Sequence, residues 1–530
     1  MDHRNRFRLE SLGIFLFALL LFTLGIWNQQ PEGFDGRWAL FLQEMFRHGA
    51  SFFPTTYGQP YADYPGTATF LSYVFARLFG APNHLANVLP TALASAGVVA
   101  LIYRLLVSAN RQWALLTVLL TLLTTQLLEK SRSVCLDQIV ALLCVGSFYL
   151  LQSGGRLRRL AVFPLFVLGF AIRGPLGLIE VCGVVCVYWA LGKPGERVKQ
   201  VLTHGIIGLV LLAACWWLLV KLARISGGDA FADEVFKMQV GGRLDETGEP
   251  FYFYFQLSLY RYFPVVPLAL ATMVALRHRW SQRFEGDVQL VARLGACGLM
   301  ILLGLSVPHF KRAYYILPMV PMFAAVAAYG LLQAQGWFAG VRRCYEMLVA
   351  ALPALCAVAL LVCRHGWQKH GYWPDVSLPL LMGVLLALQM AALIAWRQAA
   401  RLVWLSLIAL LAQWLLLVAV VEPAKDLQFD TRQFVGQVEA LRAATPGPLV
   451  FVDLGRDTWA VRYMMNLDHD DQPVFIGGNA LERLKTLPRP SWVIVASKQA
   501  ALLKGTPLEH LTPTFKGRLN DNPLWVFLLE

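Results

Sequence analysis

Charged side chains are scarce in this sequence. Asp, Glu, Lys and Arg make up 15% of the 530 residues, whereas 57% are hydrophobic, and the mean hydropathy is +0.53. A soluble domain needs a charged surface, and this composition cannot supply one. The sequence therefore excludes an ordinary soluble protein and predicts a polytopic α-helical membrane protein embedded in a lipid bilayer.

Cysteine and histidine patterns that hold a disulfide framework or a metal are also missing. The chain has nine cysteines, most of them in apolar segments and none after Cys363. No zinc-ligand spacing occurs among them, and the histidines are scattered. The sequence therefore indicates no firm cofactor; a divalent metal stays open, although nothing in the sequence points to one.

The first apolar segment is not followed by a cleavage site for a signal peptidase. The basic start of the chain, MDHRNRFRLE, leads into the apolar run 12–27, and WNQQPEGF follows where small residues would be required. We therefore expect a retained first span.

Apolar segments recur along the chain. A spanning helix needs about 20 mostly apolar residues. The segment 67–81 is short and carries Arg77, so we expect it to lie at the interface or within an outer loop. About 13 transmembrane helices are predicted at 12–27, 84–107, 113–128, 136–152, 160–172, 175–191, 204–223, 254–276, 294–307, 314–332, 346–363, 377–395 and 402–421.

Lysine and arginine in the loops predict the orientation of the chain. With the N-terminus in the cytoplasm, nearly all cytoplasmic loops are basic, such as SGGRLRR and GKPGERVKQ. The net charge of +13 then reflects basic loops beside anionic lipid, and nucleic-acid binding is not implied. The outer loops, above all 28–83 and 224–253, carry acids and aromatic residues instead.

The sequence changes character after residue 421. An odd number of spans puts the C-terminus on the outer side, and residues 422–530 contain the strand-forming runs PLVFVD, QPVFIG, WVIVAS and PLWVFLL. Helical stretches lie between these runs, which predicts a small α/β domain with a partly parallel sheet. The predicted division is a transmembrane part at 1–421 and a small C-terminal α/β domain at 422–530.

Two acids fall in the first outer loop. Asp35 opens the segment FDGRWALFLQEMF, whose apolar residues recur at helical spacing, so we expect an amphipathic helix on the membrane surface. Asp63 and Tyr64 stand between turn-forming glycines and prolines. A solvated loop acid and a turn aspartate are the plain alternatives for these positions.

A third acid, Asp137, lies at the outer end of the segment 136–152. An acid at the edge of a membrane segment is costly unless it is paired or faces a cavity. Lys130 and Arg132 are close in sequence, and we expect one of them to pair with it. A structural ion pair and a functional carboxylate are both compatible with this position.

Several bases also occur at the outer ends of predicted spans. These are Arg173, Arg243, Lys311 and Arg312. Lys and Arg are usually enriched in cytoplasmic loops, so few are expected on the outer side. One such base could reach lipid headgroups, but several favour a shared anionic ligand such as a lipid phosphate. Carboxylates beside phosphate-binding bases suit a transferase that uses a lipid-linked phosphosugar. A lipid-linked-sugar flippase or transporter, and a non-catalytic assembly factor, are the alternatives.

The order of these motifs resembles the bacterial membrane glycosyltransferases of the C-type fold. The branch in question holds the undecaprenyl-phosphate aminoarabinose transferase of lipid A and the protein O-mannosyltransferases. The motifs that carry the resemblance are Arg37-Trp38-Ala39 followed by Glu44-Met45, Gly49 and Pro54, Tyr61 with Asp63 and Pro65, Leu136-Asp137, Arg173-Gly174, and Lys311 to Pro318 with Pro321.

The resemblance implies an activity and a set of roles. The C-type glycosyltransferase fold would use a polyprenyl-phosphate sugar donor, undecaprenyl phosphate carrying one sugar, and would invert the anomeric centre. The acceptor would be an envelope glycolipid such as lipid A or lipopolysaccharide, another envelope glycan, or a protein. The chain would lie in the bacterial inner membrane, with its C-terminal domain in the periplasm.

The resemblance also implies which residues take part. Asp35 would be the catalytic acid residue, with Asp137 assisting. The substrate loop would include Asp63 and Tyr64. The donor lipid phosphate would be bound by Arg37, Arg173, Arg243, Lys311 and Tyr315.

Two positions depart from the pattern of this family. Counted back from Arg37, Asp35 matches the second acid of the family's acidic pair, and Phe34 occupies the place of the first. Tyr64 stands where the aminoarabinose branch has a lysine. The donor sugar and the acceptor therefore do not follow from the resemblance.

Overall fold

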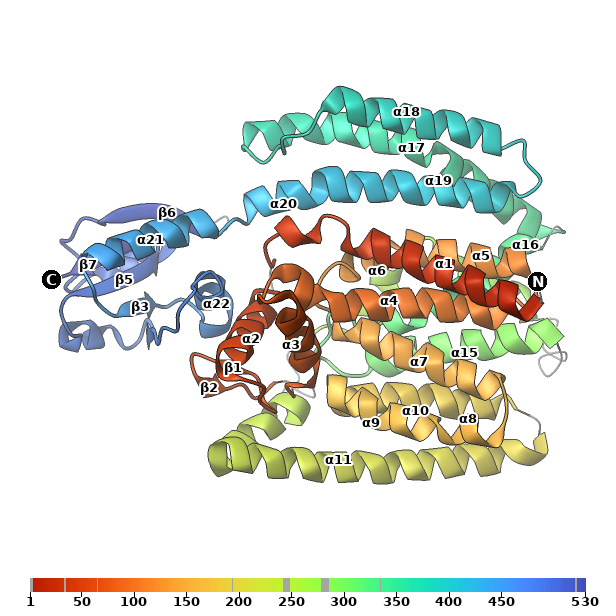
Figure 1. Ribbon diagram of the computed structural model, residues 1–530, viewed down its shortest axis with the longest axis horizontal. Helices are drawn as coiled ribbons and strands as arrows, with labels where there is room; N and C mark the ends of the chain where they lie inside the picture. The colour runs from red at the N-terminus through yellow and green to blue at the C-terminus, as the bar shows by residue number, and fades with distance from the viewer. Residues whose placement is uncertain are drawn as a thin grey trace.

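The computed structural model describes residues 3–32, 35–63, 65–192, 194–241, 248–277, 286–333, 335–519 and 522–530. Long helices lie side by side through most of the molecule, and a smaller part with a β-sheet lies at one end (Figure 1). The long helices are α1 (His3–Thr23), α4 (His84–Leu106), α5 (Arg111–Leu123), α7 (Leu136–Gln152), α9 (Val162–Arg173), α10 (Pro175–Ala190), α11 (Pro194–Phe236), α14 (Val265–Ala275), α15 (Gly286–Ser306), α16 (Val320–Leu332), α17 (Trp337–Lys369), α18 (Leu378–Ala395) and α19 (Arg401–Leu416).

Each predicted apolar segment overlaps one of these helices. Within the described ranges, six helices are long and apolar enough to cross a membrane. The others do not meet both measures, so thirteen crossings stay a prediction. Helix α3 (Thr67–Phe79) has only 13 residues, too few to span a bilayer alone, as expected for this segment.

The expectation of one continuous span over 254–276 is wrong. This stretch contains two helices, α13 (Phe253–Ser258) and α14, and the second begins directly after Pro264. Proline has no backbone N–H and its ring clashes with the preceding turn, so a helix cannot run through it undisturbed.

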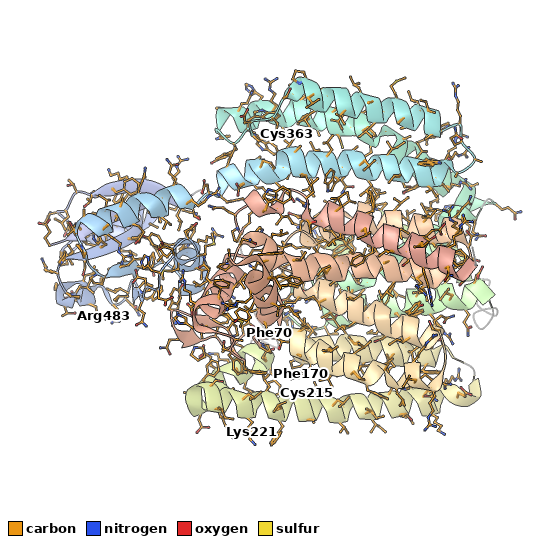
Figure 2. The ribbon with its side chains drawn as sticks, in the orientation of Figure 1. Phe70, Phe170, Cys215, Lys221, Cys363 and Arg483 are labelled. Atoms are coloured by element: carbon orange, nitrogen blue, oxygen red, sulfur yellow. The ribbon has the colours of Figure 1, made fainter. Side chains whose placement is uncertain are left out.

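The bundle has its core around α4 and α16. Helix α4 packs against α1, α5 and α7, and α16 packs against α5, α14 and α15. Helix α16 is buried along nearly its whole length, and its alanines let neighbouring helices approach closely. Helix α11 lies at the outer edge of the bundle, where Lys221 is exposed (Figure 2).

The C-terminal part contains a five-stranded mixed sheet of order β4-β3-β5-β7-β6. Strand β3 runs parallel to β4 and β5, whereas β7 runs antiparallel to β5 and β6. The four strand-forming runs lie in β3, β4, β5 and β7. The bounds are β3 (Leu449–Val452), β4 (Val474–Ile476), β5 (Ser491–Ala496), β6 (Phe515–Leu519), β7 (Asn522–Leu529), α21 (Arg432–Ala444) and α22 (Val461–Met464).

The predicted boundary at residue 421 lies inside a continuous helical stretch. Helix α19 continues through residues 417–421 into α20 (Glu422–Gln428), and the chain then enters α21. The division of the chain at this residue stays a prediction.

The first outer loop lies between the bundle and the C-terminal part (Figure 1). It contains α2 (Asp35–His48), the two-stranded pair β1 (Thr55–Thr56) and β2 (Gln59–Pro60), and α3. Helix α2 is amphipathic as predicted. Its residues are largely buried, because α3 and α22 pack against it. Its position on the membrane surface stays a prediction.

Candidate functional site

A cavity of about 280 Å³ lies where the first outer loop, the bundle and the C-terminal part meet. Five of the residues that line it carry charge or a reactive group, and the others are mostly aromatic. The lining residues are Glu32, Asp35, Trp38, Lys130, Val134, Cys135, Tyr314, Phe429 and Arg462.

Asp35 is the first residue of α2 and is only 7% exposed. Its Oδ2 accepts a hydrogen bond from the backbone N–H of Val134 at 3.1 Å. Burial raises the pKa of Asp35 to about 6, although the positive charge of Lys130 and the Val134 N–H act in the opposite direction. A carboxyl with this pKa is largely ionised near neutral pH and still basic enough to take a proton.

Lys130 provides a positive charge in the same cavity. It is the last residue of α6 (Thr125–Lys130), and its Nζ lies 5.4 Å from the centre of the Tyr314 ring. An ammonium group over an aromatic face is stabilised by the negative charge of the π-system. The cavity therefore offers a carboxylate and a cation on neighbouring walls.

A second charged cluster lies behind the wall formed by Cys135 and Tyr314. Arg173 Nε donates to Asp137 Oδ1 at 3.1 Å, and these side chains are 1% and 2% exposed. The guanidinium carbon of Arg173 lies 4.4 Å from the centre of the Tyr315 ring. Tyr315 packs edge-on against Tyr314, with ring centres 5.3 Å apart, so aromatic rings join the two clusters.

The predicted partners of Asp137, Lys130 and Arg132, are wrong. Arg173 forms the ion pair instead, because α7 begins beside the end of α9. Arg132 pairs with Glu422 at 2.6 Å, and Lys130 faces the cavity. Sequence proximity did not reveal which helix ends meet.

Among the described residues, Arg37, Lys311 and Asp63 do not line the cavity. The Arg37 side chain donates to the carbonyl of Asp457 at 3.3 Å and lies over the Tyr61 ring. Lys311 Nζ donates to the carbonyl of Glu249 at 2.7 Å.

The predicted substrate loop is only partly described. The carbonyl of Asp63 accepts a hydrogen bond from the side chain of Gln239, at the end of α11 beside Gly174. This contact brings the loop close to the Asp137–Arg173 pair. Tyr64 and Arg243 lie outside the described residues.

Of the nine residues that line the cavity, sequence reasoning predicted only Asp35 as a site residue. Glu32 lies three residues before Asp35, and this short spacing could have indicated that the two carboxyl groups lie close together. Trp38 and Tyr314 appeared within motifs, and Lys130 as a partner for Asp137, but none of them as a site residue. Phe429 and Arg462 come from the C-terminal part, and nothing in the sequence linked them to the first outer loop.

Within the described ranges, no group of three or more His, Cys, Asp or Glu side chains is arranged to hold a metal ion. The chemistry that the cavity can support is proton transfer by a carboxyl group and stabilisation of negative charge by Lys130 and Arg462.

Comparison with solved structures finds the same fold in ArnT from Cupriavidus metallidurans. The apo structure of that protein has a TM-score of 0.74 over 97% of this chain and 97% of that chain, at 13% identity. Its structure bound to undecaprenyl phosphate has a TM-score of 0.72 over 98% and 97%, at 15% identity. By sequence, no family model and no curated protein matches. The chain therefore has the C-type membrane glycosyltransferase fold, as the order of its motifs indicated.

Proposed function

We propose that this protein is a membrane glycosyltransferase that moves one sugar from undecaprenyl phosphate to an acceptor at the outer face of the bacterial inner membrane. Its fold supports this proposal, because ArnT, which has the same fold, has been crystallised with undecaprenyl phosphate bound. The carboxyl groups and cations of the cavity support it independently, because sugar transfer needs a base for the acceptor and positive charge beside the leaving phosphate.

The observation that carries the proposal is that Asp35 and Lys130 line the same cavity, where the Lys130 charge acts on the Asp35 carboxyl. Asp35 takes the proton of the acceptor hydroxyl, and the oxygen forms a bond to the anomeric carbon of the sugar. The bond between that carbon and the phosphate oxygen breaks, and its electrons leave with undecaprenyl phosphate. Attack from the opposite side of the ring inverts the anomeric centre.

Cations stabilise the negative charge that grows on the departing phosphate. Lys130 is the cation of the cavity lining whose charge acts on the Asp35 carboxyl. Arg173 and Tyr315, on the other side of Tyr314, are proposed to contact the donor phosphate. We retain the same role for Arg37, Arg243 and Lys311, and a substrate contact for Asp63 and Tyr64. Asp137 acts through Arg173, whose guanidinium it orients.

The acceptor in this proposal is an envelope glycolipid such as lipid A or lipopolysaccharide, or another envelope glycan. A protein acceptor is the alternative within the same chemistry. Both present a hydroxyl group, from which Asp35 would take the proton.

Mass spectrometry of envelope glycolipids from cells with and without the protein tests this function. We expect one sugar-sized mass increment that appears only with the protein and falls about 100-fold or more in Asp35→Asn, because a general base contributes about 10²–10⁴-fold. Asp468→Asn is the matched control, since that side chain is 99% exposed. An unchanged glycolipid and protein-glycan profile, or normal activity of Asp35→Asn at normal expression, contradicts the proposal.

A further inference from the structure

We infer that Glu32 is a second carboxylate of the site and that it binds the transferred sugar by accepting hydrogen bonds from neighbouring ring substituents. This inference rests on the proposed function and adds the residue that distinguishes a glycosylated donor from the bare lipid phosphate.

Glu32 and Asp35 lie close together in the same cavity. The backbone N–H of Asp35 donates to the carbonyl of Glu32 at 2.9 Å. Both side chains then line the same 280 Å³ space. The negative charge of Asp35 is one of the influences on the Glu32 carboxyl, as expected for two acids that share a small volume.

The two carboxyls differ in exposure, which suggests different tasks. Asp35 is 7% exposed and receives the Val134 N–H, whereas the Glu32 side chain is 38% exposed. Asp35 is therefore held in one position deep in the cavity, as a base must be. Glu32 lies nearer the opening, where it can meet a ring that enters from solvent or lipid.

The Glu32 carboxylate is available to a ligand. Among the described residues, its oxygens make no hydrogen bond, and its nearest cation is Lys425, with Nζ 4.0 Å from Oε2. Lys425 already has a closer partner, because its Nζ lies 2.6 Å from Glu129 Oε1. The Lys425 charge is therefore balanced without Glu32, and a long, half-exposed ion pair contributes little stability.

The cavity suits a single sugar ring in size and chemistry. Its volume of about 280 Å³ equals the share of roughly nine water molecules, which is enough space for one sugar ring. Three aromatic walls, Trp38, Tyr314 and Phe429, offer faces for the C–H groups of a ring. An ionised carboxylate accepts hydrogen bonds at both oxygens, which matches two neighbouring hydroxyl or amino groups.

Burial raises the pKa of Glu32 to about 7, and Lys425 opposes this shift. A carboxyl in such a place has lost part of its hydration in the free protein. Donors on a bound ring would replace the missing water and favour the ionised form.

Binding measurements on the purified full-length protein in detergent test the inference. The probes are undecaprenyl phosphate and the same lipid carrying mannose, glucose or aminoarabinose. We expect the wild type to bind one glycosylated form more tightly than the bare lipid. Glu32→Gln should weaken that form about tenfold, or ~1.4 kcal/mol, and leave the affinity for bare undecaprenyl phosphate unchanged.

Glu482→Gln is the matched control, because the Glu482 side chain is 81% exposed, pairs with Lys485 and does not line the cavity. This variant should bind every probe like the wild type. Equal losses in Glu32→Gln and Glu482→Gln, or an equal loss for the bare and glycosylated lipids, overturn the inference and leave the proposed function intact. A wild type that binds none of the lipids contradicts the proposed function itself.

Discussion

Asp35 gains its reactivity from the balance between burial and a nearby cation. Burial alone would leave the carboxyl neutral, and an exposed carboxyl would be too weak a base at neutral pH. The Val134 N–H and the charge of Lys130 both favour the ionised form. The result is a pKa of about 6, close to the operating range that suits a general base.

The rate of transfer should therefore fall at acidic pH, because Asp35 no longer acts as a base there. As the pH falls through about 6, Asp35 takes up a proton and can no longer accept one from the acceptor. Lys130→Met removes a charge that lowers the pKa of Asp35, so the acidic limb of the rate–pH profile should move to higher pH. The rate at high pH should also fall if Lys130 stabilises the leaving phosphate.

Initial rates between pH 5 and 9 measure this shift, with Lys504→Met as a control because Lys504 is exposed on the C-terminal part. An acidic limb that stays in place, or moves to lower pH in Lys130→Met, would show that Lys130 does not act on Asp35.

The functional importance of a single residue was predictable where a charged side chain occurs beside an apolar segment. Asp35 and Asp137 stood out because acids are costly at a membrane boundary. The partner of Asp137 was not predictable, since the meeting of α7 and α9 depends on helix packing. Glu32 was not predicted, because only the folded chain brings its side chain into the same cavity as Asp35.

Glu422 of helix α20 forms an ion pair that connects the parts of the chain around the cavity. Arg132 Nε and Nη2 bond Glu422 at 2.6 and 2.7 Å, and the Arg132 side chain is 1% exposed. The same guanidinium donates to the carbonyls of Leu21 and Leu24 at the end of α1. One buried ion pair thus joins α1, α20 and the loop that presents Val134 to Asp35.

Breaking this pair from one side should destabilise the protein. Glu422→Gln leaves the buried Arg132 charge without its counter-ion, which costs about 3–5 kcal/mol in comparable sites. We expect a lower apparent melting temperature in detergent, measured by intrinsic fluorescence. Removing both charges in Arg132→Met with Glu422→Leu should restore much of the loss.

Asp229→Asn serves as the control, because its pair with Arg224 is largely exposed, at 87% and 64%. Equal melting temperatures for Glu422→Gln and Asp229→Asn would mean that the Arg132 pair does not hold these elements together.

The positions of the helices followed closely from the apolar segments, because a run of apolar residues in a bilayer has to form a helix. Interruptions within a segment were harder to predict. Proline at 264 divides one segment, whereas Pro90 lies inside α4 without ending it, so packing decides which prolines break a helix.

At the scale of the molecule, the C-terminal part forms a wall of the cavity. Phe429 and Arg462 line the cavity together with residues of the bundle. Helix α2 is fixed on its other side by the same part, for example through Gln43, whose side chain donates to the Met465 carbonyl at 2.6 Å. The small part and the bundle therefore build one site together.

This arrangement requires the C-terminal part and the first outer loop to lie on the same side of the membrane. A phosphatase reporter fused after residue 430 should therefore be active only outside the cytoplasm, like one fused within residues 49–54. A reporter in the 154–155 loop should be inactive. Activity at 154–155 together with inactivity after 430 would reverse the proposed orientation.

The fold as a whole was predictable from the order and sidedness of short motifs. None of them is specific alone, yet their sequence along the chain matched one known architecture. The contact between the C-terminal part and α2 was not predictable, because it depends on surface complementarity between segments over 400 residues apart, such as Arg37 and Asp457.

Release of undecaprenyl phosphate from a glycosylated donor by the purified protein tests the central claim most directly. The assay supplies undecaprenyl phosphate carrying one sugar together with lipid A or an envelope extract. The account predicts release that depends on the acceptor, with wild-type protein active and Asp35→Asn at least about 100-fold slower. No release with any donor, or equal release by wild type and Asp35→Asn, would contradict it.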